Sequence, residues 1–103
     1  MEPTLNQNWA ENGEHDGGQS YGPGFTIAWQ RGPLTEAGRN GAFLSEVLDA
    51  CRHQLAYFEY NRHACQENAD ALGHLEQAIA LLEARRARRA AAGTLGTTQV
   101  DTP

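Results

Sequence analysis

Four residues in the C-terminal two thirds of the sequence have side chains suited to holding a nucleotide. Phe58 offers a ring on which a base can stack. The Asn68 amide carries both a donor and an acceptor for a base edge or a ribose. Arg85 and Arg89 share a face if they lie on a helix, and an anion between them would relieve their mutual repulsion. These residue types indicate a ligand that has both an aromatic base and a phosphate.

Each of these residues also has a structural interpretation. Phe58 falls in the apolar seam of a predicted helix, and Asn68 is well placed to order the turn that precedes it. Arg85 and Arg89 lie in an arginine cluster near a predicted helix C-terminus, where solvated cations suit the helix dipole. The residue types and their spacing leave both interpretations open.

The element that carries Asn68 and the arginines is a long helix predicted over residues 64–92. Its apolar residues recur at steps of three and four, which lines one helix face, and Gly93 is a natural stop. These apolar residues are Leu72, Leu75, Ile79 and Leu82. A first helix is predicted over residues 42–60, with Asn40 as its cap. Its seam consists of Leu44, Leu48, Cys51, Leu55 and Phe58.

The short link at residues 61–63 predicts an antiparallel helical hairpin, with residues 40–92 as one domain. Its two cysteines, Cys51 and Cys65, show no metal-binding spacing and are interpreted as small core residues. A two-helix hairpin cannot close a core by itself, so we expect a homo-oligomer. Arg85 follows Asn68 by seventeen residues, about 25 Å along a helix, so only a second subunit could bring the two together.

The N-terminal part of the chain is predicted to contain little regular structure. Residues 1–24 are rich in Asn, Gln and Gly and are expected to form a flexible tail. Residues 25–34 hold one predicted strand, which either lies over the helices or pairs with the same strand of another copy. Residues 93–103 are expected to form a C-terminal tail. The predicted fold class is therefore mainly α, an antiparallel two-helix hairpin with one short N-terminal strand, assembled as a homo-oligomer.

Charge and composition narrow the function further. The net charge is −5, and all eight basic side chains are arginines, four of them at positions 85, 86, 88 and 89. One arginine cluster on an acidic chain favours a local anion site over an extended nucleic-acid surface. No membrane span or signal peptide is predicted, and no catalytic or metal-binding constellation is found. We therefore expect an intracellular protein that is not an enzyme and has no cofactor or metal.

Four blocks of the sequence, in a fixed order, carry a family resemblance. They are residues 29–34 (WQRGPL), 40–43 (NGAF) and 65–69 (CQENA), and finally Arg85 and Arg89 followed by residues 93–97 (GTLGT). Together they resemble the phage-encoded helical-hairpin family of signalling-nucleotide sponges, the anti-Thoeris and anti-CBASS proteins. The resemblance spans about residues 25–100.

The resemblance implies a function more specific than the residue types do. Such proteins bind glycocyclic ADP-ribose isomers or cyclic oligonucleotides without cleaving them, as homodimers or homohexamers, in the cytoplasm of the infected bacterial host. The ligand contacts it implies fall on Phe58, Asn68, Arg85 and Arg89. Further candidate ligand contacts are Trp29, Arg31, Tyr60 and Thr97. The alternative is a helical-hairpin interaction protein or a nucleic-acid-binding accessory protein that uses the arginine cluster.

Overall fold

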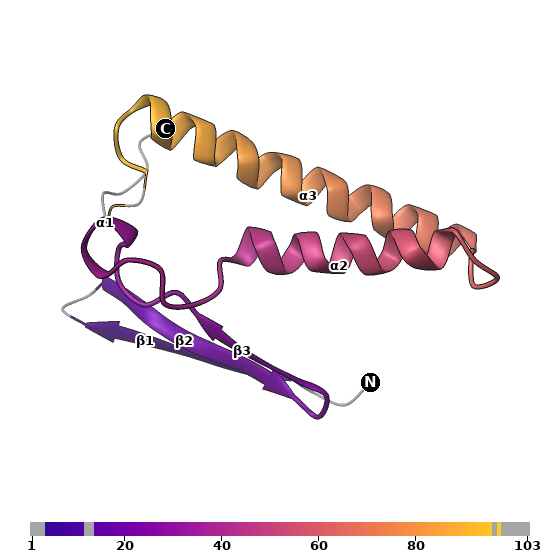
Figure 1. Ribbon diagram of the computed structural model, residues 1–103, viewed down its shortest axis with the longest axis horizontal. Coiled ribbons are helices and arrows are strands. Elements are labelled where there is room, and N and C mark those ends of the chain that lie inside the picture. The colour runs from indigo at the N-terminus through magenta and orange to yellow at the C-terminus, as the bar shows by residue number, and fades with distance from the viewer. Residues whose placement is uncertain (1–3, 12–13, 96, 98–103) are drawn as a thin grey trace. The chain divides into compact units, whose positions relative to one another are not determined.

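The structure, a computed structural model, describes residues 4–11, 14–95 and 97 of the chain. It contains a three-stranded antiparallel sheet and three helices (Figure 1). In chain order the elements are β1 (Leu5–Glu11), β2 (Glu14–Gly22), β3 (Phe25–Trp29), α1 (Leu34–Ala37), α2 (Leu44–Glu59) and α3 (Gln66–Ala91). The chain divides into a sheet unit, residues 1–43 with 94–103, and a hairpin unit, residues 44–93.

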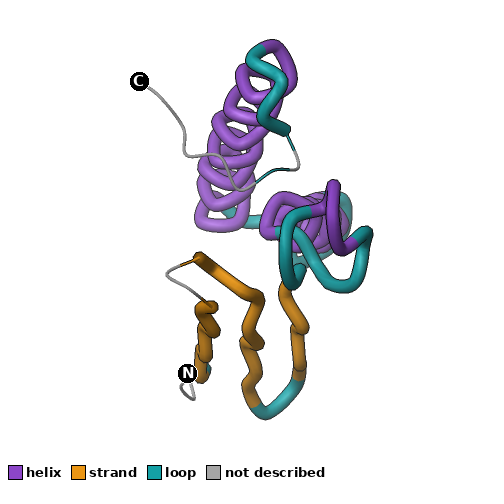
Figure 2. Tube along the Cα trace, turned by 90° about the vertical axis from the view of Figure 1, so that its left-hand side faces the viewer, coloured by secondary structure: helices purple, strands orange, loops and turns teal. Residues whose placement is uncertain are grey.

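The sheet corrects the expectation of a single unpartnered strand. The strands are ordered β1-β2-β3, and β3 pairs with β2 inside the same chain (Figure 2). The segment that was expected to be a tail contributes β1 and β2. Their polar side chains bond across the strands: Gln19 donates to Gln7 at 3.0 Å, and Ser20 donates to Asn6. Such cross-strand pairs stabilise a sheet without apolar residues.

A β-bulge interrupts the pairing of β1 with β2. The register passes from Asn8 opposite Gly18 to Ala10 opposite His15, so Trp9 faces two residues, Asp16 and Gly17. Gly17 has a φ of 80°, in the left-handed region that glycine adopts without strain. The bulge sets the position of the Asp16 carboxylate, which contacts Arg31 just beyond β3.

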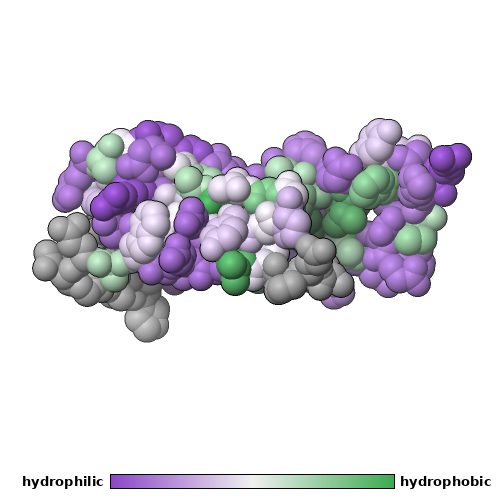
Figure 3. Space-filling model, turned by 90° about the horizontal axis from the view of Figure 1, so that it is seen from below, coloured by the Kyte–Doolittle hydropathy of each residue, from purple (hydrophilic) through white to green (hydrophobic). Residues whose placement is uncertain are grey.

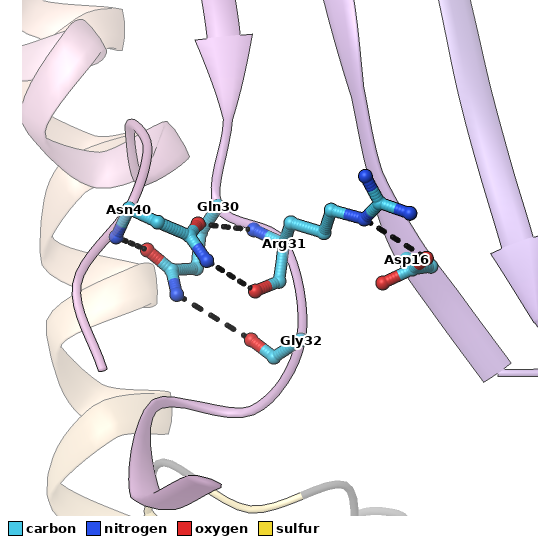
Figure 4. Close-up of polar contacts among 5 residues, drawn as sticks. All are labelled: Asp16, Gln30, Arg31, Gly32 and Asn40. Carbon is cyan, nitrogen blue, oxygen red and sulfur yellow. Dashed lines mark hydrogen bonds and ion pairs between the residues drawn. The ribbon is translucent and has the colours of Figure 1, made fainter. Parts of the chain in front are cut away.

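The connector between β3 and α2 is held by two amide side chains, as Figure 4 shows. Asn40 accepts from the Arg31 N–H and donates to the Arg31 carbonyl, both at 2.8 Å. The Gln30 Oε1 atom accepts from the N–H groups of Asn40 at 2.9 Å and Gly41 at 3.2 Å. The prediction that Asn40 caps the following helix is therefore wrong, because its amide is used to pair with the Arg31 backbone.

The hairpin unit agrees with the predicted helical hairpin. In it α2 and α3 run side by side in opposite directions (Figure 1). Cys65 is the N-cap of α3, and its Sγ atom accepts from the Asn68 N–H at 3.4 Å. Gly93 follows the end of α3 with a φ of 75°, as a helix stop should. The interpretation of the cysteines as core residues is wrong, since both Cys51 and Cys65 are exposed.

Apolar residues of the described chain are only partly covered. None of them is fully buried, and the seam residues of α2 and α3 are at best half-buried. Leu81 on α3 is 72% exposed and Tyr57 on α2 is 64% exposed. Figure 3 shows apolar side chains, in green, open on one face of the molecule. No helix among the described residues is long and apolar enough to cross a membrane.

Candidate functional site

Phe58 lies near the C-terminal end of α2, beside the turn of the hairpin. Its ring is half-buried and meets two neighbours. The His63 ring stands edge-on to it, with ring centroids 6.1 Å apart and planes at 82°. The Tyr57 ring is tilted by 56° against it at 5.9 Å. Such edge-on and tilted contacts are the geometries that aromatic pairs favour, and they help to hold the ring in position.

Asn68 lies in the first turn of α3 and is bonded to the same turn. Its Nδ2 atom donates to the His63 carbonyl at 3.0 Å. Among the described residues its Oδ1 atom accepts no hydrogen bond. Asn68 therefore does order the turn, as its structural interpretation held, while its one acceptor atom stays available to a ligand.

Two further polar side chains fix the turn and were missed by the sequence analysis. Asn61 donates to the Tyr57 carbonyl and accepts from the His63 N–H, both at 2.9 Å. Glu59 accepts from the Cys65 N–H at 3.2 Å. Asn61 could have been recognised as a turn former from its residue type alone. Glu59 offered no such signal, because its contact depends on how the two helices meet.

The arginine end of α3 differs from the exposed pair that the spacing predicted. Arg85 is exposed, but Arg89 is buried, with 6% of its surface accessible. Both side chains, and Arg88, already have interactions within the chain. A buried guanidinium that is held in place loses less side-chain entropy on binding an anion than one that moves freely.

The two groups of candidate residues do not meet within one hairpin. The helix α3 is continuous from Gln66 to Ala91, with Asn68 in its first turn and Arg85 and Arg89 in its last two turns. Asn68 and Arg85 are therefore about 25 Å apart at about 1.5 Å per residue. The structure brings Phe58 close to the turn that holds Asn68, and leaves the arginines at the other end.

The further candidate contacts are divided between the two units. In the sheet unit, Trp29 donates from Nε1 to the Ser20 hydroxyl at 2.7 Å, and the Arg31 guanidinium pairs with Asp16 at 3.1 Å. Thr97 donates to the Thr94 carbonyl at 2.6 Å. Tyr60 lies at the hairpin turn and is 90% exposed.

Three titratable side chains of α2 form a local cluster. Arg52 and His53 both contact the Asp49 carboxylate, at 2.9 and 3.2 Å. The hydrogen bond from Arg52 holds the pKa of Asp49 below its ordinary value. All three side chains are at the surface, where such pairs contribute little to stability. Among the described residues no group of His, Cys, Asp or Glu is arranged to hold a metal ion.

Comparison with known proteins gives one informative similarity. The chain matches no protein-family model. It is 38% identical over 72 residues to "Thoeris anti-defense 1" of Bacillus phage SBSphiJ7, a match that covers 70% of this chain and 51% of that protein. The chain thus spans about half the length of the relative it matches. It is a relative of the phage anti-Thoeris proteins, and the family recognition made from its sequence is confirmed.

Proposed function

We propose that this phage protein binds and sequesters a cyclic nucleotide immune signal, and so blocks bacterial anti-phage defence without cleaving the signal. The proposed ligands are glycocyclic ADP-ribose isomers or cyclic oligonucleotides. The observation that carries the proposal is the arrangement of the hairpin, with the Phe58 ring and the Asn68 amide at its turn and the arginines at the far end of α3. The similarity to a phage protein named for anti-Thoeris defence supports it.

The binding site is assembled from two subunits of a homo-oligomer. One subunit supplies Phe58 and Asn68 from its hairpin turn, and another supplies Arg85 and Arg89 from the far end of its α3. Antiparallel packing of two hairpins achieves this, because it places the turn of each beside the arginine end of the other. The partly covered apolar residues of the hairpin unit favour such packing, since neither α2 nor α3 buries its seam within one chain.

Each residue has a distinct task in this site. A base stacks on the Phe58 ring, while the His63 and Tyr57 rings hold that ring in position. The Asn68 Oδ1 atom accepts from an exocyclic amine or a ribose hydroxyl, while its Nδ2 atom remains bonded to the turn. The arginines form charge-assisted hydrogen bonds with the phosphates. Sequestration needs only these contacts, and no nucleophile or general base takes part.

The first experiment identifies the ligand. Purified protein is screened by thermal shift against glycocyclic ADP-ribose isomers and against cyclic di- and trinucleotides. A ligand at a hundred times its Kd should stabilise the folded state by about 2.7 kcal/mol. After binding, the protein is denatured and the released ligand is analysed by mass spectrometry. Intact ligand in stoichiometric amount supports sequestration, and a cleaved product would show instead that the protein is an enzyme.

The second experiment tests the arginines by calorimetric titration with the selected ligand. Arg85→Ala should weaken binding by about ten- to a hundredfold, the cost of about 1.5–3 kcal/mol for a charge-assisted hydrogen bond. Arg86→Ala is the matched control, because it removes the same charge from the neighbouring position of the same helix. Arg89→Ala should also weaken binding, with its fold checked by circular dichroism because Arg89 is buried.

The outcome of the control decides between two mechanisms. If Arg86→Ala loses as much affinity as Arg85→Ala, the arginine end acts only as a diffuse positive field and the specific site is wrong. A nucleic-acid-binding protein would show a different pattern. It would bind any DNA, with an affinity that falls steeply as the salt concentration rises.

A further inference from the structure

Among the residues that the structure describes, no strand pairs with the outer edge of β1. In the described part of the sheet, β1 pairs only with β2 on its inner side. The opposite edge, at β3, is partly covered, because Ala42 bonds to the β3 end through Gln30 and Ala28. All side chains from Thr4 to Ala10 are exposed. The edge strand β1 is therefore the place where another strand can extend this sheet.

Apart from Glu11 at its end, the sequence of β1 lacks the features that usually prevent strands from pairing. Natural edge strands are commonly protected by proline, by lysine or by other charged residues. Residues 5–10, with the sequence LNQNWA, contain none of these. The two large apolar side chains of the segment, Leu5 and Trp9, are exposed at 56% and 45%. An unprotected edge that carries exposed apolar residues is typical of a strand that has a partner.

The segment is also self-complementary about Gln7. In a sheet, residues 5, 7 and 9 point to one face and residues 6 and 8 to the other. When two copies pair antiparallel about Gln7, Leu5 of each copy faces Trp9 of the other, and Asn6 faces Asn8. The apolar pair then lies on one face and the amides pair on the other. No charged side chain lies opposite a like charge in this register.

Trp9 is already held by its own chain. The Arg31 guanidinium lies 6.0 Å from the Trp9 ring centroid and is itself fixed by its contact with Asp16 at 3.1 Å. A cation over the ring and the β-bulge opposite it both limit the orientation of the indole. A side chain fixed before association loses less conformational entropy when an interface forms.

We propose that β1 pairs antiparallel with β1 of a second copy of this chain, in a register centred on Gln7, and joins two sheets into one of six strands. This contact is separate from the hairpin packing of the proposed function, and the two can form in the same oligomer. The pairing is isologous, so it closes after two copies. A chain with both contacts can build assemblies larger than a dimer.

The test is site-specific cross-linking without ligand. The native thiols are first removed as Cys51→Ala and Cys65→Ser, since serine retains the capping role at the start of α3. Gln7→Cys then places the new thiol directly opposite its symmetry mate, and a short bismaleimide should link two chains. Gln19→Cys is the matched control. It loses the same Gln7–Gln19 hydrogen bond, yet lies one strand further in, about 14 Å from its mate at three strand spacings.

A second pair of variants tests the edge itself. Leu5→Lys, in the Gln7→Cys background, should reduce the cross-linking yield to that of Gln19→Cys. The reason is that a lysine on an edge strand disfavours pairing with another strand. Thr26→Lys is its control, since Thr26 lies in the same row and on the same face, on β3. It should leave the cross-link unchanged. Circular dichroism checks that each variant is folded.

Two results would overturn the proposal. One is an equal yield from Gln7→Cys and Gln19→Cys. The other is no cross-link from Gln7→Cys at concentrations where light scattering detects an oligomer. Because no ligand is present, neither result bears on the cyclic-nucleotide site, and loss of ligand binding would leave the strand pairing untouched.

Discussion

The Asn68 side chain donates to the carbonyl oxygen of His63 at 3.0 Å, and this bond joins the first turn of α3 to the hairpin link. The same turn places the His63 ring against Phe58. The Asn68 amide, which is proposed to bind the ligand, therefore also supports the Phe58 ring, on which the base is proposed to stack. A substitution at Asn68 is expected to affect both stability and binding.

Asn68→Ala should lower the free energy of unfolding by about 0.5–1.5 kcal/mol, because a net intramolecular hydrogen bond is lost. It should also weaken ligand binding. Chemical denaturation and calorimetry measure the two effects. Gln77→Ala is the control, because Gln77 is an exposed amide on the same helix, and it should change stability by no more than about 0.5 kcal/mol. Equal effects from both variants would argue against a special role for Asn68.

Phe58→Ala should weaken ligand binding by about 1–3 kcal/mol if a base stacks on the ring. Phe58 is half-buried, so this variant also loses apolar packing. Phe58→Leu separates the two effects, because leucine retains apolar volume and lacks an aromatic face. The leucine variant should remain folded and still bind weakly in titration. Wild-type affinity in a folded Phe58→Leu protein would remove the ring from the site.

Mixed oligomers test whether the site lies between subunits. Phe58→Ala and Arg85→Ala proteins each have every site damaged, and each alone should bind poorly. When they are unfolded together and refolded, a mixed dimer has one site with both native residues. With random pairing, about a quarter of all sites should recover, by the symmetry of a two-fold dimer. Titration counts these sites, and no recovery would place Phe58 and Arg85 in the same subunit's site or in none.

Gly41→Ala should destabilise the sheet unit. A Cβ at Gly41 would lie 2.6 Å from the Trp29 carbonyl carbon and 2.7 Å from the Gln30 nitrogen, so the connector must move away from β3. We expect a loss of about 1–3 kcal/mol, as for overpacked sites. Gly24→Ala is the control, because a Cβ there meets no atom within 4 Å. Denaturant titrations of the two variants should therefore differ clearly.

The surface cluster on α2 predicts a contribution to folding stability that depends on pH. The hydrogen bond from Arg52 holds the pKa of Asp49 below its ordinary 3.8. Because the folded-state pKa is lowered, the stabilisation is present above the unfolded value and is lost as the pH falls through the lowered one. Asp49→Asn should therefore lower the melting temperature slightly at neutral pH and have no effect in strong acid. A difference that persists well below pH 3.8 would assign the effect to packing rather than to charge.

The helical hairpin could be predicted from the sequence because its signals act over short distances. The apolar repeat of α3, the alanines between its leucines and the stop at Gly93 all operate within a turn or two of helix. The separation of Asn68 from Arg85 followed directly, since helix length depends only on residue number. The family resemblance rested on the same local blocks.

The sheet could not be predicted in this way. The segments of β1 and β2 are rich in amides and glycine, and their stability depends on partners that lie far away in sequence. Gln7 bonds to Gln19 and Asn6 bonds to Ser20 only after the strands are paired. A polar strand lacks the alternation of apolar and polar residues by which strands are predicted from sequence. Its hydrogen-bonding partners are distant in sequence and are known only from the fold.

The same reason explains the individual residues that were misjudged. Asn40 has the residue type of a helix cap, but the tertiary structure brings it beside Arg31, and its amide pairs there. Arg89 has the spacing of an exposed cation, but the folded chain buries it. Local propensity determined the two long helices. Burial and long-range hydrogen bonds arise only when the chain packs, and these decided the sheet and the surroundings of each candidate residue.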